Sequence, residues 1–327
     1  MGHTASATSA ETTGKASGTT SAETTGAISP FALQHVTVAR VEVLSPTYRR
    51  VTFTGPDVRH CADNRYDQRI KLLFPQPGGD LAAMPMHGDW YAGWRALPDD
   101  VRPFLRTYTI REVRADRGEF DVDVALHGRI GPASAWAMDA TVGDGVVVCV
   151  PDARASVSGG GVDWHAPASA DRVLLAGDET ALPAIAGILE MLPAETVGTA
   201  IVEVPDAEDA AALGTHPDGV QVVVLARGAA AVGTLLRPAV ERAAGAAVHA
   251  ARSAGTVLDD VDVDHELLWE VPDAVASDGA RVPLYAWLAG EAGVIKLLRR
   301  HLVSTLGVDR RAVAFMGYWR AGQPERN

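Results

Sequence analysis

The pattern of apolar and polar positions changes character about halfway along the chain. Between Leu33 and about Val150, short apolar runs alternate with polar residues and are separated by Pro, Gly and Asp turns. Such runs are typical of antiparallel strands. Six of them, with one helix near Ala133–Ala140, predict a closed antiparallel β-barrel. The expected strands are Val36–Val43, Tyr48–Phe53, Arg69–Phe74, Thr107–Val113, Glu119–Leu126 and Gly145–Val150.

From Asp171 onward, apolar strands alternate with helical patterns. This alternation predicts a parallel, doubly wound α/β sheet, whose ligand site lies outside the carboxyl ends of the strands. Glu203 at one such end would hydrogen-bond a ribose hydroxyl and favour NADH, whereas Arg227 at the next would hold a 2′-phosphate and favour NADPH. The sequence leaves that choice open. The residues at strand ends, which together predict a dinucleotide site, are Gly177, Glu203, Arg227, Gly290 and Gly317.

The segment before the barrel has its own composition. Residues 1–29 are mainly Ser, Thr, Ala and Gly, and T-S-A-E-T-T-G occurs in them from Thr8 and again from Thr20. Such a segment buries too little apolar surface to offset its ordering entropy, so we expect a disordered tail. The expected division of the chain is a disordered tail (1–30), a barrel domain (31–153), a linker or loop (154–170) and an α/β domain (171–327).

Bulk composition narrows the class of protein. A length of 327 residues favours two domains, and a net charge of −12 argues against a nucleic-acid or anionic-membrane partner. The two cysteines, Cys61 and Cys149, support neither a disulfide framework nor an iron–sulfur cluster. The histidines show no metal-ligand spacing, so we expect no protein-bound metal. No apolar run reaches membrane-spanning length and no signal peptide is evident, so we expect a cytoplasmic protein without membrane insertion. We also expect a monomer.

The stretch R-T-Y-T-I-R (106–111) places two cations, an aromatic ring and a hydroxyl on a few residues of extended chain. Downstream, G-P-A-S (131–134) is expected to open a helix. A helix start carries free N–H groups and the positive end of the dipole, which suits a diphosphate. A ligand with a large flat ring and a diphosphate matches both features, and FAD is such a ligand.

The second half of the chain supplies a matching nucleotide motif. Residues 173–189 predict a buried strand, a turn with glycine and an amphipathic helix, the arrangement by which parallel sheets present N–H groups to a nucleotide. The turn is not a G-x-G-x-x-G fingerprint, and its Asp178 and Glu179 are unfavourable beside a phosphate. Farther on come W-L-A-G-E (287–291), K-L-L-R-R-H (296–301) and G-Y-W-R-A-G (317–322).

Taken together and in this order, the motifs resemble the siderophore-interacting protein family, whose members are FAD-dependent ferric-siderophore reductases related to the ferredoxin-NADP reductase superfamily. The resemblance spans roughly residues 33–322. The pieces that carry it are K-L-L-F-P (71–75), R-T-Y-T-I-R (106–111), H-G-x-x-G-P-A-S-x-W-A (127–137), G-D-E-T-A-L-P-A-I (177–185), A-G-E (289–291) and G-Y-W-R-A-G (317–322).

The resemblance implies that the barrel binds FAD. Arg106 would neutralise its diphosphate, Tyr108 would stack on the isoalloxazine and Thr109 would approach the N5 edge. Strand alternation places Arg106 and Tyr108 on one face, with Thr109 on the other unless the strand bends. Arg111 would support the ribityl-phosphate region. The diphosphate turn, with His127 nearby, would be formed by Gly131, Pro132, Ala133 and Ser134.

The resemblance also implies that NADH or NADPH binds to the α/β domain as electron donor. Because NAD(P)H delivers two electrons together as a hydride and Fe(III) accepts one electron, a flavin must bridge the two, and we assign no catalytic side chain. The implied pocket is formed by Gly177, Asp178, Thr180 and Ala181. The nicotinamide would be flanked by Gly290, Glu291, Tyr318 and Trp319.

The implied substrate is an anionic ferric siderophore, which local cations must attract. Lys71, Arg129 and Lys296 are the candidates, each weighed against an ordinary solvated side chain. Two other functions stay open. One is a flavin reductase that passes electrons to a protein partner. The other is a non-catalytic siderophore-binding module, supported only by the acidic turn at Asp178 and Glu179.

Overall fold

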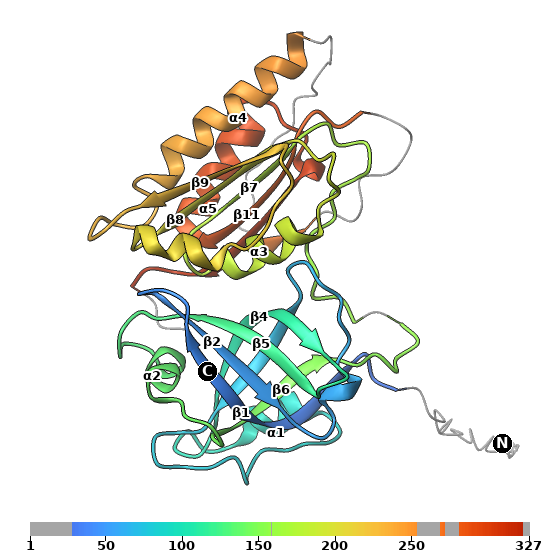
Figure 1. Cartoon of the computed structure of the whole chain (residues 1–327), viewed down its shortest axis with the longest axis vertical. Helices are drawn as coiled ribbons and strands as arrows, with labels where there is room; N and C mark the ends of the chain where they lie inside the picture. Colours follow the sequence, from blue (N-terminus) through green and yellow to red (C-terminus); the bar gives the residue numbers. More distant parts are fainter. Residues whose placement is uncertain (1–27, 158, 254–268, 272–280, 323–327) are drawn as a thin grey trace, which may run out of the picture.

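The computed structural model describes residues 28–157, 159–253, 269–271 and 281–322. It consists of a β-barrel and an α/β sheet stacked along the long axis of the molecule (Figure 1). Residues 1–27, which make up most of the predicted tail, lie outside the described part of the chain. Within the described part, no helix combines the length and the apolar character needed to cross a bilayer.

The predicted barrel is confirmed. Its six antiparallel strands close in the order β1-β2-β5-β4-β3-β6. Alternate side chains such as Val36, Phe53, Leu72 and Phe120 point inward and are buried in one core. The strands are β1 (Phe31–Val43), β2 (Tyr48–Thr54), β3 (Arg69–Phe74), β4 (Phe104–Arg114), β5 (Glu119–Ala125) and β6 (Gly145–Pro151).

Helix α2 (Pro132–Asp139) lies close to its predicted position and packs Ala133 and Ala137 onto the barrel core. A further helix, α1 (Trp90–Ala96), was not predicted. It is short, and it forms because the Asp89 side chain accepts the Ala92 N–H and because Trp94 is buried against the outside of the barrel. A 3₁₀ turn, η1 (Val58–His60), follows β2.

The second sheet has the order β10-β12-β11-β7-β8-β9. Its five long strands are parallel, which confirms the predicted doubly wound sheet. The edge strand β10 (Trp269–Glu270) is antiparallel to β12 and was not predicted, so the sheet is mixed. The parallel strands are β7 (Val173–Gly177), β8 (Gly198–Val204), β9 (Val220–Ala226), β11 (Tyr285–Glu291) and β12 (Val313–Trp319).

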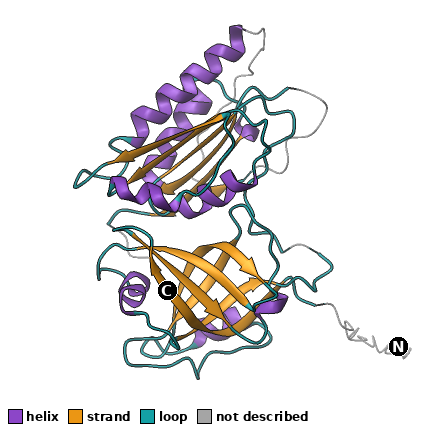
Figure 2. Ribbon diagram, in the orientation of Figure 1, coloured by secondary structure: helices purple, strands orange, loops and turns teal. Residues whose placement is uncertain are grey.

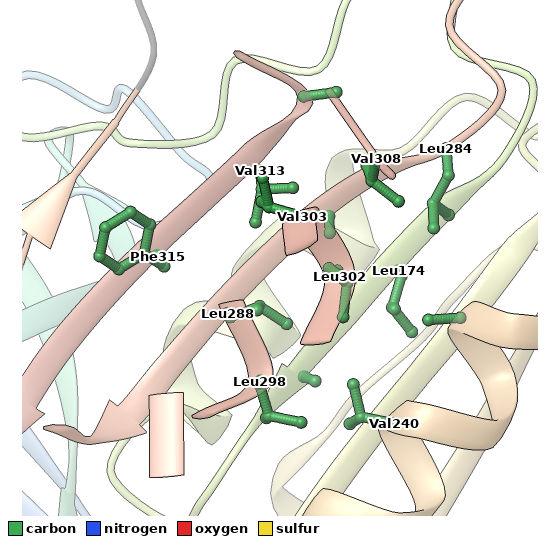
Figure 3. Close-up of a cluster of buried hydrophobic side chains, with 14 of the residues drawn as sticks. Leu174, Val240, Leu284, Leu288, Leu298, Leu302, Val303, Val308, Val313 and Phe315 are labelled. Atoms are coloured by element: carbon green, nitrogen blue, oxygen red, sulfur yellow. The ribbon is translucent and has the colours of Figure 1, made fainter. Parts of the chain in front are cut away.

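Helices cover both faces of this sheet (Figure 2). Helix α3 (Leu182–Met191) lies between the sheet and the barrel, where its buried residues share a core with Tyr48 of β2 (Figure 1). Helices α4 (Leu236–Ser253) and α5 (Ala292–Arg300) pack on the other face, around the cluster drawn in Figure 3. The remaining turns are η2 (Ala207–Ala212), the π-helical η3 (His301–Thr305) and η4 (Arg310–Ala312).

The barrel and the sheet are joined by buried polar contacts as well as by apolar packing. The Ser45 and Thr47 hydroxyls both donate to the Asp209 carboxylate, at 2.6 and 2.7 Å. The Tyr48 hydroxyl donates to the Glu179 carbonyl at 2.5 Å. Buried polar groups that satisfy one another in this way fix the orientation of two surfaces. The domain boundaries at residues 153 and 171 stay a prediction.

Candidate functional site

Strand β4 and helix α2 meet through a row of aromatic rings. The Tyr108 ring meets Phe74 edge to face at a centroid distance of 6.3 Å, and Phe74 lies 4.9 Å from Trp136 of α2. Helix α2 also packs against β3, β4 and β5. The segments that carry R-T-Y-T and G-P-A-S are therefore neighbours in space, although about twenty residues separate them in the chain.

The start of α2 is left open by its own side chains. Gly131 is the N-cap residue, Pro132 occupies the first turn, and no side-chain hydrogen bond caps the helix. The Ser134 hydroxyl donates to the Gly128 carbonyl at 2.6 Å and accepts the His127 N–H at 2.9 Å, so it holds the preceding turn in shape. A helix start with uncapped N–H groups suits an anion.

The register of β3 and β4 divides the candidate residues between two faces. Arg106 pairs with Leu72 and Tyr108 pairs with Ile70, so both share the side of the barrel-core residues. Lys71 pairs with Thr107, and its Nζ donates to the Thr107 hydroxyl at 2.6 Å. Thr109 is buried and shares the face of Lys71, because the irregularity in β4 comes only after Ile110.

Arg111, which was predicted to support the ribityl-phosphate region, forms ion pairs within the protein. Its guanidinium donates to both carboxylate oxygens of Glu190 on α3, at 3.2 and 2.7 Å, and lies 3.3 Å from the Asp123 carboxylate. The side chain is almost fully buried. Because its charge is already matched by two carboxylates, we assign Arg111 to the contact between the barrel and the sheet.

At the carboxyl edge of the sheet, Asp178 joins the ends of three strands. Its buried carboxylate accepts the Thr180 N–H at 2.9 Å, the Glu291 N–H at 2.7 Å and the Trp319 Nε1–H at 2.8 Å. Burial, together with the charge of Glu179, raises the pKa of Asp178 to about 6. The ends of β7, β11 and β12 are thereby held by one side chain.

Gly290 is required beside this carboxylate. Its φ of +141° lies in a region that other residues rarely adopt, and an added Cβ would come within 2.5 Å of Asp178 Oδ2. Gly177 is also tightly packed, because a Cβ there would lie 2.6 Å from the Ala289 carbonyl oxygen. Both predicted pocket glycines are therefore explained by close packing at the strand ends.

Neither residue that we considered for donor choice has its side chain available. The buried Glu203 carboxylate accepts three backbone N–H groups at the start of α4, from Gly233, Leu235 and Leu236, at 2.6 to 2.9 Å. Arg227 forms a two-pronged ion pair with Glu179, at 2.6 and 2.7 Å. The expected contacts of Glu203 with a ribose hydroxyl and of Arg227 with a 2′-phosphate are therefore not supported by the structure.

Tyr318 and Trp319 lie in different surroundings, Tyr318 in an aromatic cluster and Trp319 at the end of the strand. The Tyr318 ring stacks on Trp269 at 5.7 Å and meets Trp287 edge to face at 6.4 Å. Its hydroxyl is buried without a hydrogen-bond partner among the described residues, and burial raises the Tyr318 pKa well above 10.0. Tyr318 thus belongs to an internal aromatic cluster, whereas Trp319 is held at the strand end by Asp178.

The remaining predicted residues lie on separate elements. Glu291 caps α5 by accepting the Val294 N–H at 2.9 Å, and buried Ala181 is the N-cap residue of α3. Arg129 forms a two-pronged ion pair with Asp139 on the exposed surface, at 2.6 and 2.7 Å. Lys296 is exposed on α5. His127 Nδ1 lies 3.7 Å from the Glu179 carboxylate, which places the barrel turn next to the sheet edge.

One residue that joins the two domains was missed. Asp67 precedes β3 and is fully buried, and it accepts hydrogen bonds from the Asp163 N–H at 3.1 Å and from Trp287 Nε1 at 3.1 Å. Burial and the nearby charge of Asp163 raise the pKa of Asp67 to about 6. These partners lie 96 and 220 residues away in the sequence, so no local pattern could have pointed to this contact.

Comparison with known families assigns both domains. A family model for the siderophore-interacting FAD-binding domain matches residues 37–155. A second model, for the siderophore-interacting protein, matches residues 170–322. The two matches divide the chain near the linker between the barrel and the sheet.

Individual relatives are similar over most of the chain. An uncharacterised protein of Mycobacterium tuberculosis is 34% identical over 86% of this chain and 88% of its own length. The ferric vibriobactin reductase ViuB of Vibrio cholerae is 26% identical over 88% of this chain and 89% of its own length. The crystal structure of the siderophore-interacting protein SipS from Aeromonas hydrophila covers 90% of this chain and 94% of its own, with 30% identity and a TM-score of 0.61.

Proposed function

This chain belongs to the siderophore-interacting protein family, and on that premise we propose that it is an FAD-dependent oxidoreductase that reduces ferric siderophores with a reduced nicotinamide donor. The observation that carries the proposal is the open start of α2, a helix that packs against β4, the strand of Arg106 and Tyr108. A cation, an aromatic ring and free helix N–H groups together match a flavin with a diphosphate.

The residues present fit FAD. In this proposal the backbone N–H groups at Ala133 and Ser134 and the half-buried Arg106 bind the diphosphate, and Tyr108 offers a stacking surface. Ser134 shapes the turn through its bonds to Gly128 and His127. FAD, when bound, would take up one hydride, which carries two electrons, and release the electrons singly, which matches a nicotinamide donor to Fe(III). The protein itself needs no general acid or base for this chemistry.

The name of one relative supports a ferric siderophore as the electron acceptor. ViuB is a ferric vibriobactin reductase, and it is similar to this chain over both domains. Hard-oxygen chelators hold Fe(II) much less tightly than Fe(III), so one-electron reduction would release the iron. Lys71, on the face of buried Thr109, is the cation that we propose to attract an anionic chelate.

The test is a sequence of spectra on the purified protein. We expect a bound-flavin absorption band, its bleaching when NADH or NADPH is added without oxygen, and its recovery when a ferric siderophore follows. A ferrous-specific chelator should then trap Fe(II), whereas an iron-free siderophore should restore nothing. A chelate that binds without being reduced would indicate a binding module. A reduced flavin that reacts only with an added redox protein would indicate a reductase for a protein partner.

A further inference from the structure

The helix starts at the carboxyl edge of the sheet are filled by the chain's own acidic residues. Before α3, the Thr180 N–H donates to the Asp178 carboxylate at 2.9 Å, and the Ala181 and Leu182 N–H groups donate to the Asp178 carbonyl at 3.0 and 3.2 Å. The next residue, Pro183, has no N–H. The turn between β7 and α3 therefore has no donor left from Thr180 to Pro183.

Each of the other two helix starts meets a carboxylate from a strand end. At α4, the Glu203 carboxylate takes the N–H groups of Gly233, Leu235 and Leu236. At α5, Glu291 takes the Val294 N–H at 2.9 Å and also accepts the Ala321 N–H at 3.2 Å. These carboxylates occupy the positions in which a doubly wound sheet holds the phosphates of a dinucleotide.

The charge of the edge is also unfavourable for a diphosphate. Asp178, Glu179 and Glu203 are buried there. The side chain of Arg227, which is mostly buried, is paired with Glu179 at 2.6 Å. Exposed cations such as Lys296 and Arg320 remain, but dissolved salt screens charges that face solvent. A diphosphate at this edge would meet negative charge and backbone N–H groups that already donate to acceptors within the protein.

We infer that the α/β domain does not hold the ADP half of a nicotinamide dinucleotide, and that the donor is recognised through its dihydronicotinamide end alone. The inference rests on the proposed function and specifies its donor class as simple dihydronicotinamides, with NADH and NADPH treated alike. The electron balance does not change. One dihydronicotinamide gives a hydride to the flavin, and two ferric chelates each receive one electron.

A direct binding measurement tests the inference without any turnover. ADP-ribose carries the diphosphate and adenosine but no nicotinamide. Calorimetry on the flavin-loaded protein should find its dissociation constant weaker than about 1 mM. Binding tighter than about 0.05 mM would overturn the inference, because the ADP half would then be held.

A rate comparison tests the same point on the wild-type protein. Flavin bleaching after rapid mixing gives kcat/KM for NADH, NADPH and reduced nicotinamide mononucleotide, which lacks the ADP half. We expect the three values to agree within about tenfold, since no phosphate anchor distinguishes them. An advantage of about 100-fold for either dinucleotide would contradict the inference.

A gain-of-binding variant sharpens the test. Glu179→Gln keeps the size of the side chain but removes the charge that neutralises Arg227, so ADP-ribose should bind about tenfold more tightly than to the wild type. The matched control is Asp171→Asn, which releases Arg281 at the amino edge of the sheet and should change nothing. Equal gains in both variants would mean that net charge and not the edge is responsible, against the inference.

Failure of the inference can be told apart from failure of the proposed function. Dithionite reduces the flavin without any nicotinamide, and a ferric siderophore is then added. Reoxidation with Fe(II) release supports the reductase function whatever the donor measurements show. ADP-ribose binding decides the inference in either case.

Discussion

Helix α2 of the barrel and helices α4 and α5 of the sheet begin in different ways. No side chain caps α2, whose first residues follow Gly131 directly. Helix α4 begins against the buried carboxylate of Glu203, and α5 begins against the half-buried carboxylate of Glu291. The N–H groups at the helix start thus have no side-chain acceptor in the barrel, whereas carboxylates accept them in the sheet domain.

The difference teaches where this chain can bind negative charge. An unfilled helix start on an element that packs against β4, the strand of the half-buried Arg106, suits an anionic ligand. A filled start stabilises the fold instead, because its N–H groups are satisfied inside the protein. We therefore assign the resident cofactor to the barrel and a largely structural role to the acidic residues of the sheet edge.

The largest expected effect comes from breaking the anion site of the barrel. Arg106→Ala removes the cation proposed to face the FAD diphosphate, and charge-assisted hydrogen bonds are strong, so FAD affinity should fall about 100-fold or more. Flavin absorbance per protein after extensive dialysis measures the loss. Arg117→Ala, which removes the same charge from the exposed β4–β5 turn, is the control and should keep its flavin. Full occupancy in Arg106→Ala would remove Arg106 from the site.

The next effect tests the structural role of the acids in the sheet. Glu203→Ala leaves three backbone N–H groups at the α4 start without their acceptor, which should lower the free energy of unfolding by about 2 kcal/mol. Urea unfolding followed by circular dichroism measures it. Glu241→Ala breaks the Arg237 pair on the outer surface of α4 and should cost less than about 0.5 kcal/mol. Equal losses would show that the Glu203 cap contributes nothing special.

The sequence predicted the architecture better than it predicted the sheet edge. Barrel strands and parallel strands have strong local patterns, so both sheets and their order of elements were predicted. The short edge strand β10 and helix α1 have only two and seven residues, too few for a periodic pattern. The elements that carry the motifs at Arg106 and Gly131, β4 and α2, are neighbours because both pack on the barrel core. A shared cofactor site at these motifs stays a prediction.

The roles of the charged residues depend on partners that only the fold reveals. Glu203 and Arg227 stand at strand ends, as expected, but the strand end alone does not show which groups they meet. Their partners are the α4 start, about thirty residues beyond Glu203, and Glu179, 48 residues before Arg227. Arg111 is similar, because its partner Glu190 lies 79 residues away. Sequence motifs locate such side chains but cannot tell an internal ion pair from a ligand contact.

A smaller effect concerns the junction at Asp67. Its pKa in the folded protein is about 6, above the ordinary 3.8, so the folded state binds a proton that the unfolded state lacks as pH falls through about 6. Wild-type stability relative to Asp67→Asn should therefore rise by about 1 kcal/mol between about pH 7 and about pH 5. Urea titrations at both values measure the change.

Asp121 of the barrel gives the matched control for this pH effect. Burial alone would raise its pKa, but hydrogen bonds from Arg114 and Thr52 hold the pKa of Asp121 below 3.8. Its stabilisation is lost only as pH falls below that value, so the difference between wild type and Asp121→Asn should stay constant over the same interval. A constant difference for Asp67→Asn as well would refute the raised pKa of Asp67.

The smallest effect asks which domain attracts the ferric chelate. Lys71 shares a β-barrel face with buried Thr109, whereas Lys296 is an exposed residue on α5 of the sheet domain. If the barrel binds the anionic ferric chelate, Lys71→Gln should raise the KM for that chelate about threefold. Added salt should reduce the difference in KM between the variant and the wild type, because partly exposed charges are screened. Lys296→Gln carries the same charge change and should leave that KM unaltered. The reverse result would place the chelate beside the sheet, and the contrast between the two domains would then hold for the cofactor but not for the substrate.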